Sequence, residues 1–243
     1  MIERRATRAV ILAAGTGSRL SDGRQELPKP LRKVAGVPMC VRVLRTLAAA
    51  GLREAVVITG YQGELVRTAL LSEPNLGLRL MFVDNPRYEN KNGVSLLAAR
   101  DFINEECVLT MSDHLYSPEL VRRLLAFELP EGACALGVDY DIERCFDLDD
   151  ATKVGAERTR ITAIGKELER YQALDTGVFR IGPALIEELS RLDAERGDCS
   201  LSDGVAALAR RGQFFAADVG DVRWIDVDTP AALERAEAML HVF

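Results

Sequence analysis

Residues 9–31 read AVILAAGTGSRLSDGRQELPKPL, a short apolar run that turns into a long polar loop. The run VILAA has the length and character of a buried strand. Gly15 and Gly17 follow it at once, and glycines let backbone N–H groups approach an anion closely and form a concave nest around it. Arg19 and Lys29 bring positive charge to the same loop. The stretch therefore predicts a strand that leads into a phosphate-binding loop.

The spacing of this loop excludes two common kinds of phosphate site. It has no glycine–lysine–serine or threonine sequence, so it is not the loop of the P-loop NTPases. Leu20 stands where a dinucleotide fingerprint has its third glycine, and the β-rich run at 55–59 is followed by no acid that could bind a ribose. The next clear helix begins near Pro38, and a loop of about 20 residues is usually functional. A plain turn remains the alternative, but the loop has room for a triphosphate.

Strand-like and helix-like segments alternate through the first half of the chain. The β-rich runs lie at 10–14, 55–59, 78–83 and 107–111, and helical patterns separate them. This rhythm is typical of a parallel sheet covered on both faces. From Ala133 onward, short β-like pieces lie close together, which indicates a mixed or antiparallel extension. We expect an α/β fold with a Rossmann-like, doubly wound, mostly parallel sheet, helices on both faces and a small β extension in the second half.

Length and composition are those of one globular domain. The chain has 243 residues, of which 48% are hydrophobic and 28% charged. We expect a single domain over residues 1–243, with a nucleotide-binding half at 1–130 and an acceptor-binding half at 131–243. No apolar run reaches the roughly 20 residues that span a bilayer, and the N-terminus leads into a strand rather than a signal peptide. These features predict a cytoplasmic protein without a membrane span.

Charge and cysteine usage exclude several partners. The five cysteines are scattered without a CxxC pair, which favours reduced, structural residues over zinc or disulfides. A net charge of −6 argues against nucleic-acid binding, which needs a basic face. An acidic protein that handles phosphates must concentrate positive charge locally, and a divalent metal is the usual supplement.

Carboxylates at strand ends are the candidate metal ligands. Asp113 stands just past the apolar run at 107–111, at the edge where ligands bind in open α/β sheets. Asp226 and Asp228 follow another short β-rich run. Two carboxylates from separate strands could hold one Mg²⁺, which prefers oxygen ligands. Asp228 is better explained as part of a helix cap with Thr229, which leaves Asp113 and Asp226 as the predicted pair.

His114 and the polar residues of the second half carry weaker signals. His114 adjoins Asp113, but a phosphate monoester is already anionic and needs no general base to attack phosphorus, so we expect a structural role for the histidine. Lys153 lies in a short strand, and Asp175 and Thr176 begin another. These three could bind an acceptor's phosphate and hydroxyls. A lysine in an edge strand also protects against aggregation, and spacing alone does not decide between the two roles.

Several motifs together resemble the sugar-phosphate nucleotidyltransferases, which join a nucleoside triphosphate to a sugar or alcohol phosphate and release pyrophosphate. They are LAAGTGSRL, PKPL, the strand-end Asp113 and WIDVDT, and they extend over nearly the whole chain. More narrowly, NGVSLLAA, LTMSDHLY, DLDDATKV, IGKEL, LDTGVF and WIDVDT, in that order, look like the inositol-1-phosphate cytidylyltransferases. Two features differ from that pattern: the longer insertion SDGRQELPKPL, and Asn90-Lys91-Asn92 ahead of Gly93.

The resemblance implies a role for each matched residue. The first loop would hold the β and γ phosphates, Lys29 would stabilise the α-phosphate, and Asp113 and Asp226 would bind Mg²⁺. The implied catalytic residues are Arg19, Lys29 and Asp113. The implied nucleotide-binding residues are Leu12, Ala13, Ala14, Gly15, Thr16, Gly17, Ser18, Arg19, Lys29, Asn85, Gly93 and Ser95. The implied acceptor-binding residues are Lys153, Asp175 and Thr176.

The predicted reaction is Mg²⁺-dependent transfer of CMP from CTP to inositol 1-phosphate, giving CDP-inositol and pyrophosphate. Phosphocholine and sugar 1-phosphates are alternative acceptors, and a catalytically silent nucleotide sensor is an alternative of another class. A choline site needs an aromatic cage, and the single Trp without an aromatic cluster in the second half favours a polyol. Many relatives have a membrane-embedded synthase fused behind this enzyme. The sequence ends at Phe243 without such a segment, so we expect any such synthase to be a separate protein.

Overall fold

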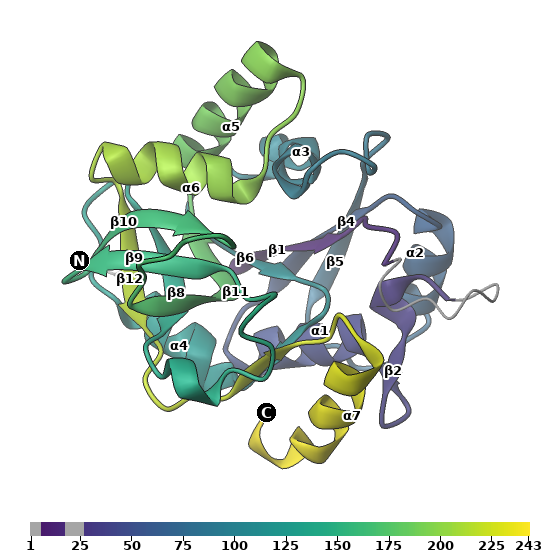
Figure 1. Cartoon of the computed structure of the whole chain (residues 1–243). Coiled ribbons are helices and arrows are strands. Elements are labelled where there is room, and N and C mark those ends of the chain that lie inside the picture. The colour runs from purple at the N-terminus through teal and green to yellow at the C-terminus, as the bar shows by residue number, and fades with distance from the viewer. Residues whose placement is uncertain (1–5, 18–26) are drawn as a thin grey trace.

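The structure is a computed structural model that describes residues 6–17 and 27–243 (Figure 1). Ser18 and Arg19, both predicted to bind phosphate, lie outside the described residues. One sheet of nine strands runs through both halves, in the order β5-β4-β1-β6-β11-β8-β12-β10-β9. Its first four strands, β5 (Arg79–Asp84), β4 (Glu54–Thr59), β1 (Arg8–Ala13) and β6 (Cys107–Met111), are mutually parallel.

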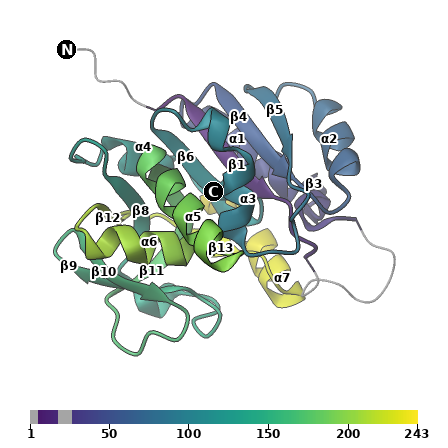
Figure 2. The same cartoon turned by 90° about the horizontal axis from the view of Figure 1, so that it is seen from above.

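Side chains of the first strand alternate between two buried layers, as expected for a strand covered on both faces. Ala9, Ile11 and Ala13 pack with α1 (Met39–Ala49), α2 (Gly63–Leu71) and α4 (Pro118–Ala126). Val10, Leu12 and Ala14 pack with α3 (Asn92–Ala98), α5 (Pro183–Arg196) and α6 (Leu201–Arg210). Figure 2 shows this second group of helices lying over the sheet.

The second half adds strands of mixed direction. They are β8 (Cys134–Asp139), β9 (Lys153–Glu157), β10 (Arg160–Gly165), β11 (Ala173–Ile181) and β12 (Phe214–Asp218). β11 runs antiparallel to β6 and β8, whereas β8 and β12 are parallel. β9 pairs with β11 as well as β10, so this part of the sheet curls back on itself. The arrangement confirms the predicted mixed α/β fold.

Two small two-stranded sheets, several 3₁₀ turns and the helix α7 complete the fold. β7 (His114–Tyr116) and β13 (Trp224–Asp226) form an antiparallel pair in which Asp226 lies opposite His114. β2 (Lys33–Val34) and β3 (Val37–Pro38) form a hairpin after the 3₁₀ turn η2 (Lys29–Leu31). The other elements are η3 (Arg100–Phe102), η4 (Ile142–Arg144), α7 (Pro230–Ala238) and η5 (Leu240–Val242). Within the two described ranges, no helix combines the length and the apolar character needed to cross a membrane.

Gly93, in the first turn of α3, is the point where α3 touches the segment that leads into α6. A Cβ at this position would lie 2.6 Å from the carbonyl oxygen of Cys199 and 2.9 Å from the carbonyl carbon of Ser200. The neighbouring Asn92 joins the same segments, because its Oδ1 accepts the backbone N–H of Leu201 at 2.9 Å. A side chain at position 93 would therefore push two helices apart.

We expect Gly93→Ala to lower the free energy of unfolding by about 1–3 kcal/mol, since the added methyl meets backbone atoms that cannot rotate away. The measurement is urea unfolding followed by circular dichroism. Gly165→Ala is the control, because no heavy atom lies within 4 Å of a Cβ built there. Equal stability of the two variants would contradict this account of the helix contact.

Candidate active site

A cavity of about 870 Å³ opens at the carboxyl ends of the parallel strands. This is the usual place and size for a ligand site in an open α/β sheet. Its walls include Leu12 of β1 and residues 14–17 that follow this strand, together with residues that follow β6 and residues of β13. The predicted site residues that line it are Leu12, Ala14, Gly15, Thr16, Gly17, Lys29, Ser95, Asp113, Asp175 and Asp226.

Lys29 is a buried residue in the wall of this cavity. The residue begins η2 between two prolines and is only 9% exposed. Its ammonium group forms ion pairs with the carboxylates of Asp113 and Asp228. Gly17 has φ of +65°, and a Cβ there would collide with the side chain of Lys29. The glycine loop thus packs directly on the lysine, which brings the two candidate phosphate-binding elements together.

The carboxylates around Lys29 come from distant parts of the chain. Burial alone would raise the pKa of Asp113, but the charge of Lys29 and the hydrogen bond from His114 outweigh it and hold the pKa well below its usual range. Asp113 is therefore ionised. The expectation that Asp228 caps the last helix is wrong: Thr229 is the N-cap and accepts the N–H of Ala232 at 3.1 Å, while Asp228 pairs with the lysine.

Acidic groups at this point could hold a divalent cation. Ligand atoms of Asp113, His114 and Asp226 lie within 4.8 Å of one another, and so do those of a second group, Asp150, Asp226 and Asp228. Asp226 belongs to both groups. Carboxylate oxygens suit a hard cation such as Mg²⁺ or Ca²⁺ better than a soft transition metal. The donor set therefore fits the predicted pair of Asp113 and Asp226, with two further carboxylates close by.

His114 holds these acids in place. Its Nδ1 lies 3.0 Å from an Asp113 oxygen and 3.7 Å from an Asp226 oxygen. Burial would lower the pKa of His114, but the nearby carboxylates of Asp226, Asp113 and Asp175 raise it to about 9. These carboxylates thus favour the protonated form of the imidazole. This geometry supports the structural role that we expect for His114.

Gly177 packs closely against the His114 ring. Its φ is +74°, and a Cβ there would collide with the imidazole. We expect Gly177→Ala to cost about 2–4 kcal/mol of stability, because backbone strain and overlap add together. Gly132→Ala is the matched control: its φ is also +74°, but no heavy atom lies within 4 Å of a Cβ there. Thermal unfolding measures both, and an equal loss in the control would show that the His114 contact contributes nothing.

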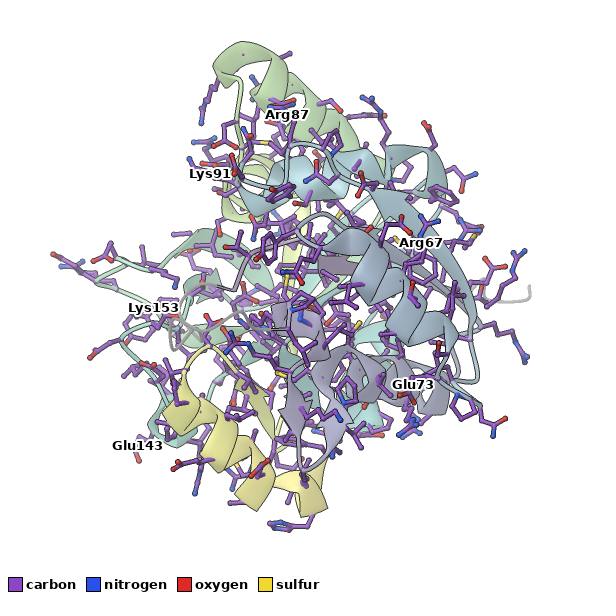
Figure 3. The ribbon with its side chains drawn as sticks, turned by 90° about the vertical axis from the view of Figure 1, so that its right-hand side faces the viewer. Arg67, Glu73, Arg87, Lys91, Glu143 and Lys153 are labelled. Carbon is purple, nitrogen blue, oxygen red and sulfur yellow. The ribbon has the colours of Figure 1, made fainter. Side chains whose placement is uncertain are left out.

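The three predicted acceptor residues lie in different surroundings. Asp175 lines the cavity; burial raises its pKa to about 6, and its Oδ1 accepts the N–H of Gly177 at 2.7 Å. Thr176 is fully buried and donates to Gly137 O at 2.7 Å. The Nζ of Lys153 donates to Asp149 O at 3.1 Å. Lys153, which is labelled in Figure 3, is not among the described residues that line the cavity. The roles of Asp175, Thr176 and Lys153 in acceptor binding stay predictions.

The predicted nucleotide-binding residues also fall into two groups, those that line the cavity and those that do not. Ser95 lines the cavity, whereas Ala13 belongs to the core on the opposite face of the sheet. Asn85 is 2% exposed, and Gly93 packs against the segment before α6. Neither of these two is among the described residues that line the cavity. Their contact with a base or ribose also stays a prediction.

The cavity contains residues that sequence patterns did not single out. Its additional cations are Arg144, Lys166, Arg223 and Arg235, and its aromatic residues are Tyr88, Phe146, Phe179 and Trp224. Three of these four aromatic residues come from the second half of the chain. The ring pairs among the described residues, Tyr61–Tyr88 and His114–Trp224, do not join any of the four to another. Trp224 is held by a hydrogen bond from its Nε1 to Asp139 Oδ2 at 2.9 Å. Its position two residues before Asp226 on the same strand was the available signal, because alternate residues share a face.

A family model for the MobA-like NTP transferase domain matches residues 9–210 of the chain. The chain therefore belongs to this family of nucleotidyltransferases. Membership confirms the class of protein that the motifs of the sequence resemble.

Particular relatives narrow the comparison. A protein from Rubrobacter xylanophilus, named bifunctional IPC transferase and DIPP synthase, is 41% identical over 96% of this chain and 51% of its own length. A protein of the same name from Aquifex aeolicus is 34% identical over 96% of the chain and 51% of its own length. The chain thus spans about half the length of these curated relatives. The structure of the inositol-1-phosphate CTP transferase from T. maritima is similar, with a TM-score of 0.86, 25% identity, and coverage of 98% and 96% of the two chains.

Proposed function

We propose that the protein transfers CMP from CTP to an inositol phosphate and releases pyrophosphate. The observation that carries the proposal is the buried Lys29 between Asp113 and Asp228, packed against the glycine loop at the carboxyl ends of the parallel strands. The names of the relatives and of the T. maritima structure support the choice of nucleotide and acceptor.

The chemistry follows from the charges in the cavity. An oxygen of the acceptor's phosphate attacks the α-phosphorus of CTP in line with the leaving pyrophosphate. That oxygen is already anionic, so alignment and neutralisation of charge matter more than proton removal. Lys29 would contact the α-phosphate, and the N–H groups of residues 15–17 would hold the terminal phosphates. A Mg²⁺ ion between Asp113 and Asp226 would supply further neutralisation.

We propose that the two halves divide the work. The first half would bind the nucleotide through the glycine loop and α3. The second half would bind the acceptor near Asp175, with Lys166 and Arg223 as cations that line the same cavity. The relatives' names join the transferase to a DIPP synthase. We therefore propose that the nucleotide-linked polyol is the substrate of such a synthase.

The experiment is a matrix of substrates. Purified protein receives CTP, UTP, GTP or dTTP with inositol, sugar or choline phosphates, with and without Mg²⁺, and pyrophosphate is followed. We expect turnover with CTP and an inositol phosphate, and its loss when EDTA removes the metal. The aromatic residues of the cavity favour phosphocholine as the second candidate acceptor. CTP binding without turnover on any acceptor would instead support a nucleotide sensor.

A further inference from the structure

Asp139, the last residue of β8, is a buried carboxylate that accepts hydrogen bonds on both of its oxygens. It is 5% exposed and lies in the wall of the cavity. Its Oδ1 accepts the backbone N–H of Asp141 at 2.9 Å, and the guanidinium of Arg144 lies 3.5 Å from the same oxygen. Its Oδ2 accepts the indole N–H of Trp224 at 2.9 Å. Backbone and indole N–H groups can only donate, so this position needs two acceptor atoms, which a carboxylate supplies and an amide does not.

Trp224 joins Asp139 to the His114 ring. β13 pairs with β7 so that Asp226 lies opposite His114, and Trp224, two residues before Asp226, lies on the same face of the pair. The planes of the indole and the imidazole differ by 5°, and their centroids are 6.4 Å apart, which is an offset-stacked arrangement. Stacked rings can slide over one another. The hydrogen bond to Asp139 therefore fixes where the indole lies against the imidazole.

The His114 ring in turn orients two acids. Its Nδ1 lies 3.0 Å from an oxygen of Asp113 and 3.7 Å from an oxygen of Asp226. On another edge of the ring, a Cβ built on Gly177 would lie only 2.3 Å from the Cδ2 atom. The imidazole thus packs against backbone on that edge and against the indole on its face. Its place beside the two acids depends on the position of Trp224.

We infer that Asp139 is a positioning residue for the divalent cation, because it fixes the indole that packs on His114. His114 then holds oxygens of Asp113 and Asp226 at a spacing that one cation could bridge. The inference rests on the proposed function, which takes these two acids as the metal pair. Asp139 acts through the two rings, so the proposal requires no contact between its carboxylate and the cation.

Asp139→Asn breaks one defined bond of this arrangement. The amide oxygen stays at the Asp141 N–H, because the guanidinium of Arg144 faces the same side. The amide nitrogen then faces the indole N–H, and two donors repel each other. Trp224→Phe removes the same bond from the other partner and keeps an aromatic ring beside His114. In the double variant, no indole N–H remains for the amide to oppose.

The measurement is the dissociation constant for Mn²⁺, a probe for a hard divalent cation, without nucleotide or acceptor. The electron paramagnetic resonance signal of free Mn²⁺ is followed for the unaltered chain, the two single variants and the double variant. We expect each single variant to bind Mn²⁺ about tenfold more weakly, the usual effect of losing an outer partner of a metal ligand. The double variant should also lose about tenfold rather than about a hundredfold, because both changes break the same bond.

Fluorescence and thermal unfolding check the first step separately. Trp224 is the single tryptophan of the chain, so the emission spectrum reports on its indole alone. We expect the emission of Asp139→Asn to move to longer wavelength, because the released indole N–H gains contact with water. Thermal unfolding of the same samples shows that each variant is folded. If Asp139→Asn does not fold, the loss of Mn²⁺ affinity in Trp224→Phe still tests the inference.

Glu143→Gln controls for charge, because Asp139→Asn also removes a negative charge from the cavity wall. Glu143, labelled in Figure 3, is an exposed acid that lines the same cavity. We expect its Mn²⁺ affinity to change by less than about twofold, since water and salt screen an exposed charge. A purely electrostatic effect of Asp139 would instead persist in the Trp224→Phe background.

Two results would overturn the inference. Unchanged Mn²⁺ affinity in Asp139→Asn, or in Trp224→Phe, would show that the two acids keep their places without the anchored indole. A further tenfold loss on adding Asp139→Asn to Trp224→Phe would assign the effect to charge. Either result leaves the proposed function intact if the protein still releases pyrophosphate from CTP and an inositol phosphate. An unaltered chain that releases pyrophosphate but binds no Mn²⁺ would overturn this inference alone, and the absence of both would remove the proposed function as well.

Discussion

Asp113→Ala should reduce pyrophosphate release by roughly 10³-fold or more, with the fold preserved. Asp113 lies just past the end of β6, is ionised, and faces Lys29, His114 and the cavity. Its loss removes one of the two carboxylates proposed to hold Mg²⁺ and one of the two ion pairs that position Lys29. The measurement is the initial rate of pyrophosphate release at saturating CTP and acceptor. Thermal unfolding of the same samples checks the fold.

Asp84→Ala is the matched control. Asp84 ends β5, another strand of the same parallel set, but it is exposed and is not among the described residues lining the cavity. We expect this variant to retain nearly full activity. Near-normal activity in Asp113→Ala would contradict the proposed mechanism. An equal loss of activity in Asp84→Ala would show that acids at this edge of the sheet affect catalysis only through the overall electrostatic field.

Lys29→Met should lower kcat by roughly 10²–10³-fold, while the KM for CTP changes less. Methionine keeps most of the length of the buried stem but removes the ammonium group. The lysine is proposed to contact the α-phosphate where negative charge develops, so its loss affects the transition state more than the bound substrate. The measurement is steady-state kinetics with CTP and the acceptor identified by the substrate matrix.

Lys33→Met serves as the control, because Lys33 lies in the neighbouring hairpin and is exposed. The Lys29 variant also leaves Asp113 and Asp228 without their shared cation. We therefore expect added Mg²⁺ to raise its melting temperature more than that of the unaltered chain. A large rise in KM with kcat unchanged would assign Lys29 to ground-state binding only.

The parts of the fold that depend on neighbouring residues could be predicted from the sequence. The apolar run at 107–111 is the strand β6 with the same bounds, and the helical pattern after Pro38 is α1. In both places local periodicity and tertiary packing favour the same structure. Sequence periodicity did not predict β7, because a strand of three residues is defined by its partner β13 rather than by its own pattern.

The parts of the site that depend on distant contacts could not be predicted. Trp224 and Asp139 are 85 residues apart, and no local rule joins them. The sequence predicts the strand that contains Lys153, but it does not predict that the Lys153 side chain donates to the carbonyl of Asp149. A motif does not tell which face of a strand points to the ligand. The position of Asp228 next to Thr229 predicts a cap of the last helix. Only the fold shows that the Asp228 carboxylate reaches Lys29.

The bond between Lys29 and Asp228 joins residues 199 positions apart, and it has a consequence for the order in which the protein forms. β1 and the two strands that pair with it, β4 and β6, all lie in the first half of the chain. The carboxylates of Asp226 and Asp228 reach the cavity only after most of the chain has emerged and β13 has paired with β7. Contacts of such long range are slow to form. A nascent chain would thus have a glycine loop without its partners, and nucleotide could not react on it before folding is nearly complete.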